Sequence, residues 1–386
     1  MQSTPGRWFG AGHSAASDSA KAGAEATTVA LAGRTPQAVF VFASAGHDLP
    51  ALLDAVRAEA GPEPAIVGGT ALGELSSTGG ASRGGVSVTA LGGDGFQVGT
   101  RLAYVGGNGH REAGAEVAAA LTGIDRPHQA LLLLCEGMSG NPHEIVRGAY
   151  SVLGAAVPLV GGLTAHDKGG ARSYQFHGDR VVTGAVIGVG IGSDAPIGIG
   201  VGHGWHRVEP PMVITRSDQR RILELDGEHA LDVLLRHRGL APTDALLTPG
   251  RRMEALGLSR RSGEDMRVIT EANADDRSVT GLATMPQGSI CWRMAGDRDS
   301  MIAGAEASCR EALDALGGRD PLGVLAFDCG GRLGELGADG VREEVEALRK
   351  ALGDVPFGGA YTLGEIARVR GSLGTHALTL VTMALA

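Results

Sequence analysis

Three carboxylates follow three glycine-rich phrases of the sequence, and they are the first candidates for chemistry. Each phrase is an apolar stretch ending in a glycine pair, at residues 68–69, 161–162 and 358–359. Glu74, Asp167 and Glu365 come five or six residues after the pairs. Because a repeated phrase indicates a repeated fold unit, we expect the three carboxylates at equivalent places, where they could converge on a ligand ammonium group or act as acid and base. Alternatively, each accepts backbone N–H bonds in the turn that its glycine pair creates.

Other polar residues near the phrases suit a small metabolite. His166 and Tyr361 lie inside two of them, among apolar residues that would line a pocket. Arg332 follows the third apolar strand, and its planar guanidinium could bind a ligand carboxylate. These residues extend the candidate ligand site beyond the carboxylates.

Two cysteines end apolar strands that we interpret as equivalent. Cys135 could supply a thiolate nucleophile with His143 as its base, if the two come within hydrogen-bonding distance. Cys329 ends the equivalent strand of the third repeat. Free cysteine is more often a buried small hydrophobe. A hydrolase using Cys135 or a carboxylate pair is therefore a third hypothesis, behind two binding functions, and we expect no enzyme.

Histidines raise the second binding hypothesis, a haem site. His203 precedes Gly204 and Trp205, and a neutral imidazole in an apolar pocket could be an axial ligand of haem iron. The sequence has no CxxCH attachment motif, and His166 and His177 are equally open to the same argument. Haem therefore stays an alternative, with His203 as the named ligand.

The composition excludes several classes of protein. The formal charge of −9, without a long basic cluster, argues against nucleic acid or an anionic membrane as the partner. Four cysteines without a CxxC pair indicate neither a zinc ribbon nor a disulfide framework, and they fit a reducing, cytoplasmic compartment. The longest apolar stretch, residues 181–202, has alternating glycines and a central turn, so we expect a buried β-hairpin there.

The order of elements repeats three times and predicts the fold class. We expect α/β architecture, with mixed sheets built from repeated β-α-β-α-β-β units flanked by helices, because βαβ crossovers give parallel neighbours and trailing hairpins give antiparallel ones. Residues 96–104 pair with 85–91 in a hairpin and also open the second unit, and residues 289–294 open the third. The repeat is absent over 208–287, which we interpret as an inserted segment with an exposed helix.

The combined motifs resemble the FIST sensory module. The matching stretches are residues 38–44, 64–75, 181–189, 201–205, 224–227 and 356–366. The resemblance implies a FIST N-like domain over 1–222, containing two units, and a FIST C-like domain over 223–386, containing the insertion and the third unit. It also implies an intracellular domain that binds a small ligand, with amino acids proposed for some members and haem, as a nitric oxide sensor, for others.

The expected function is cytoplasmic small-ligand sensing. Such modules are often fused to a kinase, cyclase or chemoreceptor, and this sequence ends soon after its last strand. We therefore expect it to act on a separate signalling protein. A homo-oligomer is left open, and neither nucleic acid nor a membrane is expected as a partner.

Overall fold

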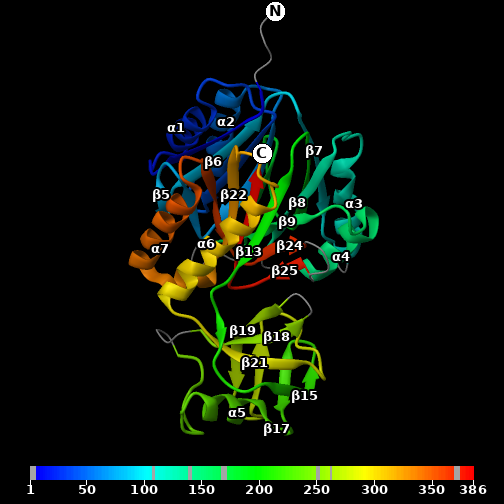
Figure 1. Cartoon of the computed structure of the whole chain (residues 1–386), viewed down its shortest axis with the longest axis vertical. Coiled ribbons are helices and arrows are strands. Elements are labelled where there is room, and N and C mark those ends of the chain that lie inside the picture. Colours follow the sequence, from blue (N-terminus) through cyan, green and yellow to red (C-terminus); the bar gives the residue numbers. More distant parts are fainter. Residues whose placement is uncertain are drawn as a thin grey trace, which may run out of the picture.

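Three mixed sheets and a β-barrel make up the chain in a computed structural model (Figure 1). The structure describes residues 6–106, 109–137, 141–166, 172–248, 253–260, 263–368 and 374–386. Within them, helices and mixed sheets confirm the expected α/β class. No helix in these ranges is long and apolar enough to cross a membrane.

The three sheets are built from three units of the same element order. The first unit comprises β1 (Trp8–Ser14), α1 (Ser19–Leu31), β2 (Ala38–Ser44), α2 (Leu49–Ala60), β3 (Ala65–Ala71), β4 (Gly73–Ser76), β5 (Gly80–Ser82) and β6 (Val86–Gly92). The second comprises β7 (Phe96–Tyr104), α3 (His110–Val117), a 3-10 helix (Ala118–Leu121), β8 (His128–Glu136), α4 (Pro142–Leu153), β9 (Leu159–Thr164), β10 (Gln175–His177), β11 (Arg180–Val182) and β12 (Ala185–Ser193). The third comprises β13 (Ile197–Gly202), α6 (Arg298–Asp314), β22 (Gly323–Cys329), α7 (Gly330–Leu352), β23 (Phe357–Thr362), β24 (Glu365–Arg368), β25 (Gly374–His376) and β26 (Leu380–Leu385).

The units exchange strands in a closed circle. Their sheets have the orders β1-β6-β2-β3-β10-β11, β7-β12-β8-β9-β24-β25 and β13-β26-β22-β23-β4-β5. The first unit thus donates β4 and β5 to the sheet of the third, the third donates β24 and β25 to the second, and the second donates β10 and β11 to the first. No unit completes its own sheet, so the three form one body.

One glycine in each phrase is fixed by close backbone approach. A Cβ atom at Gly68 would lie 1.8 Å from the carbonyl oxygen of Val41, on the parallel neighbour strand. Gly161 and Gly359 meet the equivalent carbonyls at 2.0 and 1.8 Å. The repeat therefore aligns Gly359, not Gly358, with the first glycine of the other two pairs.

The sheets bury both faces, which explains their continuous apolar strands. Alternate residues of the central strands, such as Phe42 and Phe327, point into a core shared by all three sheets, where their rings meet edge-on at 5.9 Å. The intervening residues, such as Val41, pack against the helices outside. Two of the helices start at a polar cap where the chain leaves a strand: the side chains of Asp48 and Asn141 accept N–H groups at the starts of α2 and α4.

The two predicted hairpins at the unit junctions are wrong. Within residues 181–202, β12 lies between β7 and β8, whereas β13 pairs with β26 in another sheet. Strands β6 and β7 are likewise separated. Alternating residues around a short turn fit a hairpin and a sheet-to-sheet crossing equally well, because local pattern does not specify the hydrogen-bonding partner.

An antiparallel barrel interrupts the third unit between β13 and α6. It comprises β14 (His206–Arg207), β15 (Met212–Asp218), β16 (Arg221–Leu225), β17 (Glu228–His229), α5 (Ala230–His237), β18 (Ala255–Arg260), β19 (Gly263–Asn273), β20 (Ser278–Gly281) and β21 (Ile290–Ala295). Pairing of β18 with β21 closes the ring β21-β15-β16-β20-β19-β18. Figure 1 shows the barrel below the body, with α5 at its far end.

The barrel corrects two details of the predicted third unit. The strand at 289–294 is β21 of the barrel, and the opening strand is β13, which lies before the insertion. The predicted exposed helix, α5, buries Leu231, Leu234 and Leu235 in the barrel core. The boundary of sequence domains at residue 222 stays a prediction.

Candidate functional site

Glu365 and Glu74 occupy equivalent positions in donated strands. Glu365 lies opposite Gly162 of β9, and Glu74 lies opposite Ala360 of β23. Both side chains are fully buried. The register of the paired strands, and not only the distance from the glycine pair in the sequence, therefore shows that Glu74 and Glu365 are equivalent.

Each glutamate is held by its own unit. The backbone N–H groups of Thr379 and Gly85, each just before the last strand of a unit, donate to Glu365 at 3.4 Å and to Glu74 at 3.0 Å. The hydroxyl of Thr379 also donates to Glu365 at 2.8 Å, and that of Ser82 donates to Glu74 at 2.9 Å. Each glutamate thus accepts a backbone N–H, as the alternative expected, but the donor lies just before the last strand of the unit and not in the turn after the glycine pair.

The second unit places an amide at this position. Gln175 lies opposite Gly69 of β3, and its Nε2 donates to the hydroxyl of Thr164 at 2.9 Å. Asp167, the predicted third carboxylate, lies outside the described residues. Gln175 is therefore the residue that the strand register matches to the two glutamates.

Arg332 is the centre of a buried ionic cluster rather than a free ligand-binding group. Its Nε donates to Asp328 at 2.8 Å, and its Nη2 donates to Glu344. It also donates to the backbone carbonyls of His203 at 2.8 Å and Met301 at 3.1 Å. These two carbonyls flank the barrel in sequence, so Arg332 ties both connections of the barrel to the body.

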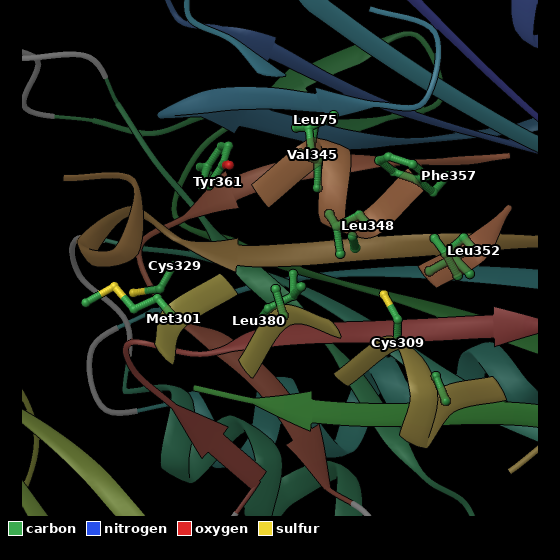
Figure 2. Packing of buried hydrophobic residues seen from close by; sticks show 14 of the residues in the cluster. Leu75, Met301, Cys309, Cys329, Val345, Leu348, Leu352, Phe357, Tyr361 and Leu380 are labelled. Carbon is green, nitrogen blue, oxygen red and sulfur yellow. The ribbon is translucent and has the colours of Figure 1, made fainter. Parts of the chain in front are cut away.

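Tyr361 belongs to the same cluster. Its hydroxyl donates to Glu344 at 3.0 Å, and Figure 2 shows it in the packed interior, where Cys329 also lies. Burial, followed by the neighbouring carboxyl of Glu344, raises the pKa of Asp328 well above its usual range. Two buried carboxyl groups, those of Asp328 and Glu344, thus share the single guanidinium of Arg332.

The cysteines do not supply a nucleophile. Cys135 is fully buried in β8, and burial raises the pKa of its thiol to about 12. Burial raises the pKa of the Cys329 thiol as well. The proposed base, His143, instead bonds Thr375 Oγ1 through Nδ1 at 2.7 Å. A protonated thiol in an apolar core is a packing residue.

The surroundings of His203 do not fit haem. Its Nδ1 accepts the backbone N–H of Trp205 at 2.9 Å. The backbone after His203 packs closely against α6, since a Cβ atom at Gly304 would lie 2.5 Å from the backbone nitrogen of Gly204. The bond from Trp205 occupies the lone pair of Nδ1 and leaves the proton of the neutral ring on Nε2, so neither ring nitrogen offers a free lone pair to haem iron in this structure. His177 bonds the hydroxyl of Thr100 at 3.1 Å, and His166 is half-buried after β9.

A cavity of about 510 Å³ lies between the body and the barrel. Its lining from the body includes Asn141, His143, Leu363, Glu365, Thr375 and His376. Its lining from the barrel includes Gln219, Arg220, Met266, Arg267, Leu282 and Thr284. Such a volume, with apolar walls and a few polar groups, suits a small molecule.

The carboxyl group and the two imidazoles that line this cavity have shifted pKa values. Burial raises the pKa of Glu365 to about 8, although hydrogen bonds from Thr379 and Thr362 oppose the shift. Burial, followed by the charge of Arg267, lowers the pKa of His143 to about 4. Burial also lowers the pKa of His376. At pH 7 the carboxyl and both imidazoles are therefore mostly uncharged.

Of the predicted site residues that the structure describes, Glu365 lines this cavity, whereas Glu74, Cys135, His166, His203, Arg332 and Tyr361 are not among its lining residues. Sequence reasoning missed Thr375, His376 and Arg267. Their positions depend on the exchange of β24 and β25 and on the docking of the barrel. No local motif could have revealed them.

Known relatives are remote. Uncharacterized proteins of Mycobacterium bovis and Mycobacterium tuberculosis are each 25% identical over 231 residues, covering 57% of this chain and 58% of the relative. The chain thus spans little more than half the length of these relatives. The solved structure of T. maritima PurL complexed with ATP aligns with 98% of this chain and 71% of that chain at 11% identity, but its TM-score of 0.22 carries no argument.

Family models match most of the sequence. The FIST N domain matches residues 37–228, and the FIST C domain matches residues 230–368. The two matches meet inside the barrel, which both of them cover in part. The chain therefore belongs to the FIST family of sensory domains.

Proposed function

We propose that this protein senses a small metabolite through the cavity between the body and the barrel, and that it acts in the cytoplasm on a separate signalling protein. FIST domains are non-enzymatic sensory domains that bind small ligands. The buried, protonated cysteines support a binding function over a hydrolytic one. Amino acids and related metabolites are the first ligand class to test.

The main support for the proposal is that the body and the barrel line one cavity together. The body contributes the turn before β24 and the start of α4, and the barrel contributes residues of β19 and the adjoining loops. A ligand there contacts both parts at once. Its binding free energy can therefore favour one relative orientation of the barrel and the body over another.

The connections of the barrel give this change a route to a partner. Only residues 203–205 and 296–297 separate the barrel strands from β13 and α6. Arg332 binds carbonyls beside both connections, at His203 and Met301. A change in the orientation of the barrel would therefore be transmitted to α6 and α7, which present exposed residues to a partner.

Calorimetric titration and thermal-shift screening of amino acids and related metabolites test the proposal. We expect a hit whose binding is lost in Ala283→Trp, because the added ring fills the cavity that Ala283 lines. Val29→Trp is the matched control, since Val29 is 50% exposed on α1 and is not a lining residue. If no metabolite binds, or if Ala283→Trp binds as the unmodified protein does, the cavity is not the ligand site.

A further inference from the structure

We infer that the inner wall of the cavity takes an uncharged hydrogen-bonding group, such as an amide, a urea or a nitrogen heterocycle, and discriminates against a charged group of the same shape. This inference rests on the proposed function and specifies the ligand class of that site. It follows from how the protein already pairs or neutralises the ionisable residues of the inner wall, which are Glu365, His143, His376 and Arg267.

The guanidinium of Arg267 is committed to the barrel. Its two terminal nitrogens donate to the two oxygens of Asp265 at 2.5 and 2.7 Å. It also donates to the carbonyls of Met266 at 2.9 Å and Thr284 at 3.2 Å. Arg267 is only 4% exposed. A ligand carboxylate would have to displace Asp265, so this arginine does not serve as an anion site.

Glu365 presents a neutral carboxyl group to the cavity. It is fully buried, and its oxygens are in contact with the hydroxyls of Thr362 at 3.0 Å and Thr379 at 2.8 Å. A protonated carboxyl both donates and accepts. Three titratable groups interact electrostatically with Glu365: Arg332, Asp328 and Cys329. His376 lies opposite Glu365 in the β24–β25 pair. Arg332 is the one cation of this set, and it is paired with Asp328 and Glu344.

The two imidazoles complete a neutral donor and acceptor set. Nε2 of His376 lies 2.9 Å from the carbonyl of Ala367, which can only accept, so this nitrogen carries the proton and Nδ1 is left as an acceptor. His143 is engaged with the hydroxyl of Thr375. An amide or urea, which donates and accepts in one plane, complements this set. Among the described residues of the inner wall, a buried ligand charge would meet no free counter-charge.

The barrel side of the cavity differs. Arg220 lines it and is exposed, so a charged end of the ligand can remain at the solvent side beside a cation. The inference therefore specifies an orientation: the neutral end of the ligand lies toward Glu365 and His376.

Matched ligand pairs test the inference on the full chain at pH 7. The pairs are glutamine with glutamate, nicotinamide with nicotinate, and citrulline with arginine. In each pair the group that differs is uncharged in the first compound, called the neutral member here, and charged in the second, at nearly the same shape. Calorimetry should show the neutral member of a binding pair at least about tenfold tighter. Equal or tighter binding of the charged member overturns the inference and leaves the proposed function standing. Failure of all six compounds counts against the cavity as the ligand site, and the inference falls with it.

A measurement without ligand gives a second test. The infrared difference spectrum between the unmodified protein and Glu365→Gln should contain the carbonyl band of a protonated carboxyl at pH 7, and this band should fade as the pH rises through about 8. Glu365→Gln should also keep the preference for the neutral ligand, since an amide retains a donor and an acceptor. A carboxylate signal at pH 7 in place of the protonated band overturns the inference.

Discussion

The first and third units place a glutamate at the same position, yet only Glu365 lines the cavity beside the barrel. Glu74 is enclosed by the hairpin that carries it, through Ser82 of β5 and the N–H of Gly85. Glu365 also accepts hydrogen bonds from its own unit. It lines the cavity that lies between the body and the barrel inserted into that unit. The repeat supplied the carboxyl group, and the insertion turned one copy of it into the wall of a site.

The three units also differ in the buried residues of their central strands. The central strands can be aligned by the residues that pair with the three equivalent glycines. In this alignment Asp328 of the third unit corresponds to Cys135 of the second and Ala43 of the first. Only the third unit places an ionic cluster at this position, and that unit carries the barrel. The cluster therefore belongs to the attachment of the barrel and not to the repeated sheet.

The largest expected effect comes from Arg332→Ala. It leaves the carboxyls of Asp328 and Glu344 buried without their cation, so we expect a loss of about 3–5 kcal/mol in the free energy of unfolding. Denaturant titration measures it. Arg342→Ala, which removes an exposed pair with Asp339, should change stability by less than about 1 kcal/mol. Equal losses for the two variants would show that the cluster does not distinguish the third unit.

Gly359→Ala is expected to cost about 1–3 kcal/mol or more, because the new methyl group collides with the carbonyl of Ala326. Gly68→Ala should behave alike, since the two positions are equivalent. Gly334→Ala, in α7 with nothing within 4 Å of its added Cβ atom, should be neutral or stabilising. Thermal and denaturant unfolding separate these outcomes, and a tolerated Gly359→Ala would contradict the aligned register.

Glu365→Gln should remove a dependence of stability on pH. Because the pKa of Glu365 is raised to about 8 in the folded protein, the folded state holds a proton that the unfolded state has released above about 4.5. Its favourable contribution is complete below pH 4.5 and is lost as the pH rises toward 8, with a slope of up to about 1.4 kcal/mol per pH unit. Unfolding free energies of both proteins from pH 5 to 8 check this, and parallel curves would refute it.

Cys135→Ala is expected to leave ligand affinity unchanged, with a stability loss of only about 1 kcal/mol from the lost sulfur contacts. The folded protein should also react with thiol reagents far more slowly than the unfolded protein, because the described cysteines are buried free thiols. Rapid modification of Cys135 in the folded state, or loss of ligand binding in Cys135→Ala, would bring this residue back into a functional role.

Much of the repeated unit could be predicted from sequence. Apolar residues at helical spacing after Asp48 predict a helix over 48–60, which is α2 with Asp48 as its cap, and the continuous apolar run at 38–44 predicts the strand β2. These succeed because caps, apolar periodicity and buried runs are local properties. The hairpins predicted at the unit junctions fail because strand pairing is decided by the competing partners, which lie far away in the chain.

The sequence by itself determined the units, their order, the glycines of the close strand pairs and the presence of buried carboxyls behind them. Only the tertiary structure decided which unit donates its hairpin to which sheet, and hence that Glu365 meets residues of β9 and the barrel while Glu74 is enclosed. It also converted Arg332 and Tyr361 from candidate ligand groups into a cluster at the base of the barrel. The physical reason is that the protonation and the accessibility of a carboxyl depend on everything packed around it, and most of what surrounds Glu365 comes from distant parts of the chain.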